Sequence, residues 1–163
     1  MRRERPVFRY QSRAGLGIFR FFGTTALDER RRVTPRDQKL IRDHLDWFNE
    51  HLPAPPVEAY VVTREMQLRG MRAITWYKPE STDLMRRTRE LALVGHRYGH
   101  QLFLLRTREP GTLAYEDEFQ IVARCCGVPA LVMPVRAMSA KGDRRRVDRE
   151  TIRRWQHSAE PIE

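Results

Sequence analysis

Three consecutive carboxylates, Glu116, Asp117 and Glu118, are the residues whose types and spacing most directly suggest chemistry. Clustered carboxylates supply the hard oxygen ligands that Mg²⁺ takes beside a phosphate, so a divalent-metal nuclease or phosphoesterase is one function they could serve. If residues 113–123 form one straight strand, Asp117 lies on a face that is otherwise apolar. If the chain turns or bulges there, Asp117 faces water instead. We expect the turned hairpin and keep the carboxylates as an alternative catalytic site.

Glu109 belongs to the same alternative. The order Glu109-Pro110 followed by Glu118-x-Gln120 loosely resembles the PD-(D/E)xK nucleases. The chain has Glu in place of the first Asp of that pattern and Gln in place of the usual Lys. What the resemblance implies is phosphodiester cleavage with a divalent metal at Glu109, Asp117 and Glu118.

A second candidate metal site is His96 with His100. Their spacing of four residues places two ligands on one face of a helix. However, Gly99 lies between them and is a natural helix terminator. A zinc site also needs three or four converging ligands. We therefore keep the two histidines only as an alternative, and expect no cofactor.

The charge is strongly basic, with 31 Lys and Arg against 21 Asp and Glu, for a formal net charge of +10. Only three of the basic residues are lysines, and the planar fork of arginine suits phosphate. Arg bias in a GC-rich genome would give the same composition. Arginines interleaved with aromatic residues suit nucleic acid, because they neutralise phosphates and stack on bases. The candidate nucleic-acid-binding residues are Arg2, Arg3, Arg5, Arg9, Arg86, Arg87, Arg89, Arg144, Arg145, Arg146, Arg153, Arg154 and Trp155.

The leading hypothesis is a small, non-enzymatic, cytoplasmic module that binds DNA, RNA or another polyanion. The adjacent Cys125 and Cys126 rarely form a structural disulfide, which favours a reducing compartment. No stretch approaches the ~18 apolar residues of a membrane span, so we expect no membrane partner. A further alternative is a protein-interaction subunit or homodimer that uses sheet edges and an amphipathic C-terminal segment.

The pattern of apolar residues predicts the elements that must position these groups. Thr34 and Pro35 indicate a helix start, and the predicted helix covers residues 35–51. A second helix begins at Ser81 or Thr82 and ends near Gly99. The predicted extended segments are residues 16–22, 57–63, 72–78, 101–107 and 112–123.

The predicted fold class is α+β, a two-layer α/β sandwich. We expect a mixed four- to five-stranded sheet with two main helices on one face, plus a basic C-terminal helical segment. Strands joined through helices are expected to be parallel neighbours, and the last two strands an antiparallel hairpin. The expected organisation is a basic N-terminal arm over residues 1–14, one α/β domain over residues 15–135, and a basic tail or docked helix over residues 136–163.

Overall fold

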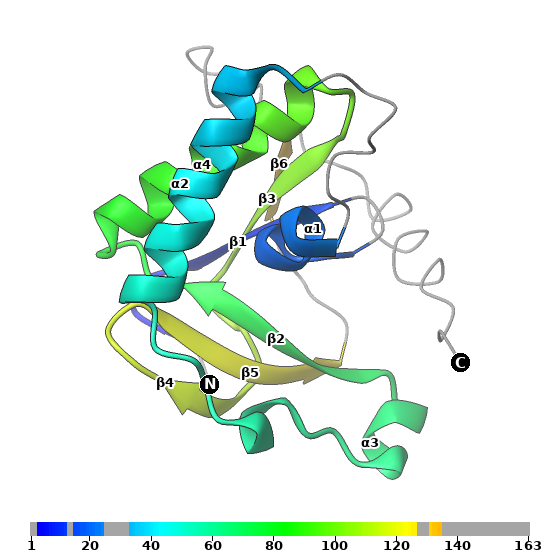
Figure 1. The fold of residues 1–163 in the computed structure, drawn as a ribbon. Helices are drawn as coiled ribbons and strands as arrows, with labels where there is room; N and C mark the ends of the chain where they lie inside the picture. The colour runs from blue at the N-terminus through cyan, green and yellow to red at the C-terminus, as the bar shows by residue number, and fades with distance from the viewer. Residues whose placement is uncertain (1–2, 13–14, 25–32, 127–130, 135–163) are drawn as a thin grey trace.

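A six-stranded sheet is the frame of the protein (Figure 1). The computed structural model describes residues 3–12, 15–24, 33–126 and 131–134. The strand order is β4-β5-β2-β1-β3-β6, and every strand pair among these residues is antiparallel. The strands are β1 (Val7–Ser12), β2 (Met71–Tyr77), β3 (Leu102–Thr107), β4 (Thr112–Glu116), β5 (Gln120–Cys126) and β6 (Leu131–Pro134).

Two long helices, α2 (Pro35–His51) and α4 (Thr82–Arg97), run side by side over one face of this sheet (Figure 1). The shorter elements are α1 (Ile18–Thr24), the 3₁₀ helix η1 (Val57–Tyr60) and α3 (Arg64–Leu68). The α+β class, with two main helices on one face, is thereby confirmed.

The start of α2 follows from its sequence. The Thr34 hydroxyl accepts a hydrogen bond from the Asp37 N–H at 3.2 Å, and Pro35 takes the first helical position, where its missing N–H is not needed. The helix occupies the residues that the sequence predicts. The buried stripe of α4 includes Leu84, Thr88 and Leu91, as the 3.6-residue period requires.

Two predicted strands are wrong. Residues 16–22 lead into and form most of α1, in which Ile18, Phe21 and Phe22 are buried at helical spacing. Residues 57–63 form η1 and the link to α3, although their β-branched composition is typical of strands. Val57 and Val61 are exposed rather than packed on a sheet, so composition alone misled the prediction.

The predicted mixed sheet and N-terminal arm also need correction. The sheet has six strands, and β1 and β2 are antiparallel neighbours although helices connect them. Several helices, rather than one crossover helix, separate these strands, so the chain can return in either direction. Residues 7–12 of the expected arm form β1, which lies between β2 and β3 inside the sheet. The predicted helix within residues 136–163 lies outside the described residues.

Both faces of the sheet carry buried apolar clusters. The cluster on the helix side includes Tyr10, Phe48, Leu91 and Leu104. Phe19 of α1 contacts Phe48 of α2 and Tyr77 of β2, with ring centroids 4.4 and 5.6 Å apart, so α1 links α2 to the sheet. The opposite face buries Val7, Trp76, Phe103, Leu105, Ile121 and Ala123.

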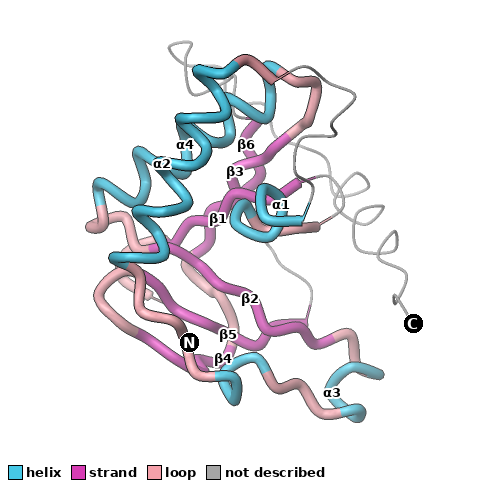
Figure 2. Tube along the Cα trace, in the orientation of Figure 1, coloured by secondary structure: helices cyan, strands magenta, loops and turns pink. Residues whose placement is uncertain are grey.

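The sheet is nearly split at its middle. β1 pairs with β2 only through Phe8 and Tyr77, whereas β1 pairs with β3 along its whole length. Figure 2 shows β4, β5 and β2 diverging from β1, β3 and β6. Arg9 bridges the gap, because its Nη1 donates to the Thr75 carbonyl oxygen of β2 at 3.1 Å.

Candidate functional site

Asp117 and Glu118 lie in the turn of the β4–β5 hairpin and Glu116 ends β4, so the predicted turn at the acidic triplet is confirmed. The predicted pairing of residues 101–107 with the last strand is wrong, because β3 pairs with β1 and β6. Asp117 is also half-buried instead of facing water.

Asp117 Oδ1 accepts hydrogen bonds from the N–H groups of Phe119 and Gln120 at 2.7 and 2.8 Å. Asp117 Oδ2 accepts from the Tyr115 hydroxyl at 3.0 Å and from Gln120 Nε2 at 3.2 Å. A carboxylate that accepts the N–H groups just after it stabilises a turn locally. Asp117 therefore has a structural reason for its position.

Glu116 ties this hairpin to two other segments. Its carboxylate pairs with Arg3 at 2.6 Å and with Lys78, which follows β2, at 2.8 Å. Hydrogen bonds from Arg3 and Lys78 lower the pKa of Glu116 to about 2. Lys78 also donates to the Asp117 carbonyl oxygen, so two cations fix the turn.

The carboxylates of the predicted catalytic set have separate surroundings. Glu109 and Glu118 are exposed, while Asp117 is half-buried in its turn. Among the described residues, no three His, Cys, Asp or Glu side chains form a group that could hold a metal ion. The geometry therefore gives the nuclease alternative no supporting observation.

The two histidines of the alternative metal site lie near the end of α4. His96 belongs to its last turn, and the ring of His100 packs edge-on against Phe21 at 5.0 Å. No third ligand joins them among the described residues. His96 Nε2 is buried without a hydrogen-bond partner in that part of the chain.

Several candidate nucleic-acid-binding arginines have partners within the protein. Arg3 pairs with Glu116, and Arg5 pairs with Glu80 at 2.8 Å. Arg9 is largely enclosed and donates to Gln11 Oε1 at 3.0 Å and to the Gly15 carbonyl oxygen at 3.4 Å, besides Thr75. Burial lowers the pKa of Arg9, but a guanidinium keeps its proton under all ordinary conditions.

The arginines of α4 divide into two kinds. Arg86 is exposed and pairs with Glu90 at 3.0 Å and with Asp83 at 3.5 Å. Arg87 contacts His44 and Trp47, but pairs with no carboxylate among the described residues. Arg89 is partly buried, and its Nε has no hydrogen-bond partner in the same part of the chain. The remaining candidates lie outside the described residues; these are Arg2, Arg144, Arg145, Arg146, Arg153, Arg154 and Trp155.

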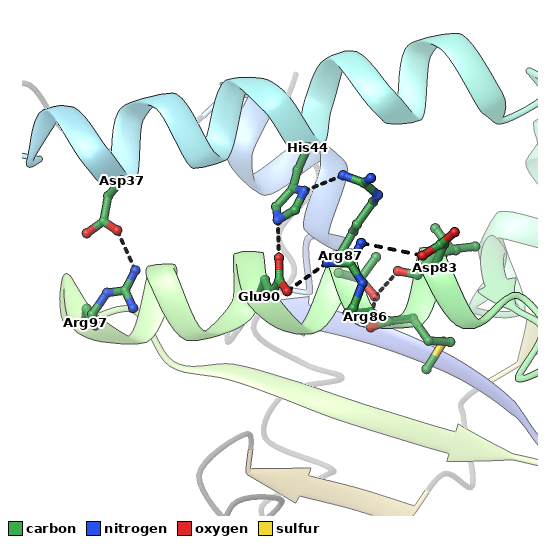
Figure 3. Close-up of polar contacts among 10 residues, drawn as sticks. Asp37, His44, Asp83, Arg86, Arg87, Glu90 and Arg97 are labelled. Carbon is green, nitrogen blue, oxygen red and sulfur yellow. Dashed lines mark hydrogen bonds and ion pairs between the residues drawn. The ribbon is translucent and has the colours of Figure 1, made fainter.

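A cluster of ionisable side chains joins α2 and α4 through hydrogen bonds (Figure 3). His44 of α2 lies between two residues of α4. Its Nε2 is 2.6 Å from Glu90 Oε2, and its Nδ1 is 3.1 Å from Arg87 Nη1. The guanidinium of Arg87 also lies over the Trp47 ring, 4.6 Å from the centroid. We call His44, Trp47, Arg87 and Glu90 the interhelical cluster.

The contacts fix the protonation state of His44. A guanidinium can only donate, so Nδ1 accepts from Arg87 and Nε2–H donates to Glu90. Burial lowers the pKa of His44; the Glu90 hydrogen bond opposes this shift, while the charges of Arg87 and Arg86 add to it. His44 is therefore neutral near pH 7, with both ring nitrogens engaged. In this arrangement it joins the helices and has no free nitrogen to act as a general base.

A second set of hydrogen bonds joins the start of α2 to the end of α4. Asp37 near the start of α2 accepts from Arg97 at 2.5 Å and from the Tyr98 hydroxyl at 2.8 Å. Burial alone would raise the pKa of Asp37, but the Tyr98 hydrogen bond and the Arg97 charge outweigh it and lower the pKa below its usual value. The hydrogen bonds of Asp37 and those of the interhelical cluster together hold α2 and α4 antiparallel to each other.

An open groove of about 320 Å³ lies against the interhelical cluster. Arg36 is exposed and has no ion-pair partner among the described residues, whereas Lys39 pairs with Asp43 at 2.7 Å. The groove therefore contains charged side chains that form an ion pair and one, Arg36, that forms none among the described residues. Its lining residues are Arg36, Lys39, Leu40, Asp43, His44, Arg87 and Glu90.

Comparison with known proteins gives no further assignment. The sequence matches no family model, and searches of curated proteins and solved structures found no match. No helix within the described residues is long and apolar enough to cross a membrane.

Sequence reasoning missed the interhelical cluster, because its members come from two different helices and His44 lies 43 and 46 residues before its partners Arg87 and Glu90. One signal was present. His44 follows the apolar Ile41 by three residues and precedes Phe48 by four, so it belongs to the buried side of the predicted helix. A histidine at such a position requires hydrogen-bond partners, which the sequence alone could not name.

The Asp117 hydrogen bonds give a direct test of its structural role. We expect Asp117→Ala to lower the free energy of unfolding by about 2 kcal/mol, because buried backbone donors lose their acceptor. Asp117→Asn should cost less, since the amide oxygen still accepts from the N–H groups. Urea denaturation measures both changes.

Glu118→Ala is the matched control, and we expect it to stay within about 0.5 kcal/mol of the original protein, as exposed substitutions usually do. Equal stability of the Asp117→Ala and Glu118→Ala variants would contradict the role assigned to Asp117.

Proposed function

We propose that this protein is a non-enzymatic binding module for a polyanion, with nucleic acid as the leading ligand. The observation that carries the proposal is the placement of its charge. The described residues hold 18 basic and 14 acidic side chains, a net of +4, out of +10 for the whole chain. The remaining +6 belongs to the rest of the chain, which includes the candidate residues 144–146 and 153–154.

Exposed arginines on the described part support the same function. Some form no ion pair with a carboxylate among the described residues, and their forks remain available to phosphate oxygens. Carboxylates such as Asp46 and Glu50 are exposed on α2 as well, so this surface is mixed in sign. The arginines to which we assign this role are Arg36 and Arg108.

The proposal places the protein in the cytoplasm. In support, the side chain of Cys125 is buried. A buried cysteine acts as a small apolar side chain and needs no oxidising compartment.

Salt dependence tests this proposal. The full chain should bind fluorescein-labelled single-stranded and duplex DNA, and its affinity should fall more than about tenfold between roughly 50 and 200 mM NaCl, because phosphate contacts release counterions. Replacing Arg144, Arg145 and Arg146 together by Gln should weaken binding and flatten the salt dependence. Fluorescence anisotropy measures both effects.

The control replaces Arg64, Arg69 and Arg72 by Gln, which removes the same charge from α3, from the residue that caps it and from β2. We expect this triple variant to retain most of the affinity. Absence of binding to DNA and RNA at the lowest salt would contradict the proposed function.

A role in protein association is the second candidate, because one stretch of twelve residues holds most of the large exposed apolar side chains of the described part. Leu68 is 82% exposed, Val57 77% and Val61 53%, with Tyr60 beside them. Exposed apolar patches are typical of interaction sites, and a stretch with several exposed apolar side chains can contribute to one. This stretch contacts β4, which pairs with β5 alone among the described strands and so leaves an edge for a second copy.

Light scattering over a concentration series tests self-association. The unchanged chain should shift from monomer to dimer as its concentration rises, and Val57→Ser with Leu68→Ser should abolish the shift. The control variant Asn49→Ser alters an exposed side chain of α2, outside this stretch and outside β4, and should leave the shift unchanged. A monomer at every concentration would count against this second candidate.

A further inference from the structure

In the groove between α2 and α4, the carboxylates have partners within the protein, whereas two of the arginines have no carboxylate partner among the described residues. Its two carboxylates already have cationic or hydrogen-bonding partners. Asp43 pairs with Lys39, and Glu90 is held by Arg86 and by His44 Nε2–H. The negative charge in the groove is therefore neutralised from within the protein.

Two arginines that line the same groove have no carboxylate partner among the described residues. Arg36 is exposed on the first turn of α2, and Arg87 projects from α4. Neither forms an ion pair with a carboxylate in the described part of the chain. The groove is thus left with a net positive character on both helices.

Arg87 is also held in place before any ligand arrives. Its guanidinium lies over Trp47 and donates one hydrogen bond to His44 Nδ1. The ring of neutral His44 accepts this hydrogen bond but carries no charge. The contact therefore positions Arg87 without neutralising its positive charge. A side chain that is already ordered loses less entropy when it binds.

We propose that this groove holds a phosphate group of a nucleic-acid backbone between Arg36 and Arg87. The inference rests on the proposed polyanion-binding function and assigns it a specific contact site. An open groove suits a continuous strand that passes across it, and guanidinium forks match the oxygens of a phosphodiester. Arg87 supplies the fixed contact, and Arg36 closes on the phosphate from α2.

Paired variants with equal charge test the assignment. Arg36→Gln with Arg87→Gln should reduce the slope of log affinity against log salt by about 1.4 for single-stranded DNA, roughly 0.7 for each lost contact. Arg42→Gln with Arg64→Gln removes the same charge from exposed positions outside the groove and should leave the slope nearly unchanged. The probe is a labelled single-stranded oligonucleotide, measured by fluorescence anisotropy.

Single variants on α2 keep the test valid if the loss of Arg87 disturbs folding. Arg36 and Arg42 are both exposed on this helix, and neither has an ion-pair partner among the described residues. Arg36→Gln should reduce the slope by about 0.7 and Arg42→Gln should not. Thermal unfolding of each variant confirms that the fold is intact.

The outcomes separate the two proposals. If the unchanged chain binds DNA but both double variants lose the same slope, the groove assignment is wrong and general polyanion binding stands. If the unchanged chain binds no oligonucleotide at low salt, the proposed function fails and the groove assignment fails with it. If inorganic phosphate competes only through ionic strength, the contact requires the polymer, as proposed. Displacement of DNA by low millimolar phosphate at constant ionic strength would instead indicate a small-ligand site.

Discussion

The hydrogen bond from the Arg9 guanidinium to the Thr75 carbonyl oxygen joins the two halves of the sheet at the seam where their strands pair least. One half of the sheet is β4-β5-β2 and the other is β1-β3-β6, and they meet at the single residue pair Phe8 and Tyr77. Arg9 continues the connection where the strand ladder stops. It also reaches the loop before α1, where a Cβ on Gly17 would lie 3.0 Å from Arg9 Nη2, so that the guanidinium would have to shift to admit a side chain there.

The position of Arg9 explains why a basic composition does not by itself describe a binding surface. Arginines in this chain serve three physical roles. Arg9 is enclosed and joins the sheet, Arg3 and Arg86 neutralise nearby carboxylates, and Arg36 remains exposed without a carboxylate partner in the described part. Only an arginine without a carboxylate partner, as Arg36 and Arg87 are within the described residues, can contribute its full charge to a ligand. The groove between α2 and α4 is where such an arginine meets the ordered Arg87.

Local signals were sufficient for some elements. Thr34 and Pro35 define the start of α2, and the turn residues of the acidic triplet indicated the β4–β5 hairpin. These predictions succeeded because caps and turns depend on neighbouring residues. The α+β class followed from the same evidence.

Non-local pairing was the source of the errors. Residues 7–12 belong to the segment predicted to be a basic arm, because residues 1–14 hold five arginines. Nothing in the sequence shows that Arg9 bonds to Thr75. The apolar run of residues 16–22 contains the helical spacing of Ile18, Phe21 and Phe22, which strand composition obscured. The site was predicted only in part. Arg87 was identified by its charge, but its neighbours His44 and Trp47 come from a different helix.

The unfolding free energy of Arg9→Lys tests the account most directly. Lysine keeps the charge but cannot span the acceptors on Thr75, Gly15 and Gln11 together, so we expect a loss of about 2 kcal/mol in urea denaturation. The control is Arg5→Lys, an exposed residue paired with Glu80, which should stay within about 0.5 kcal/mol of the unchanged protein. Equal stability of the two variants would contradict the claim that the Arg9 guanidinium joins the halves of the sheet.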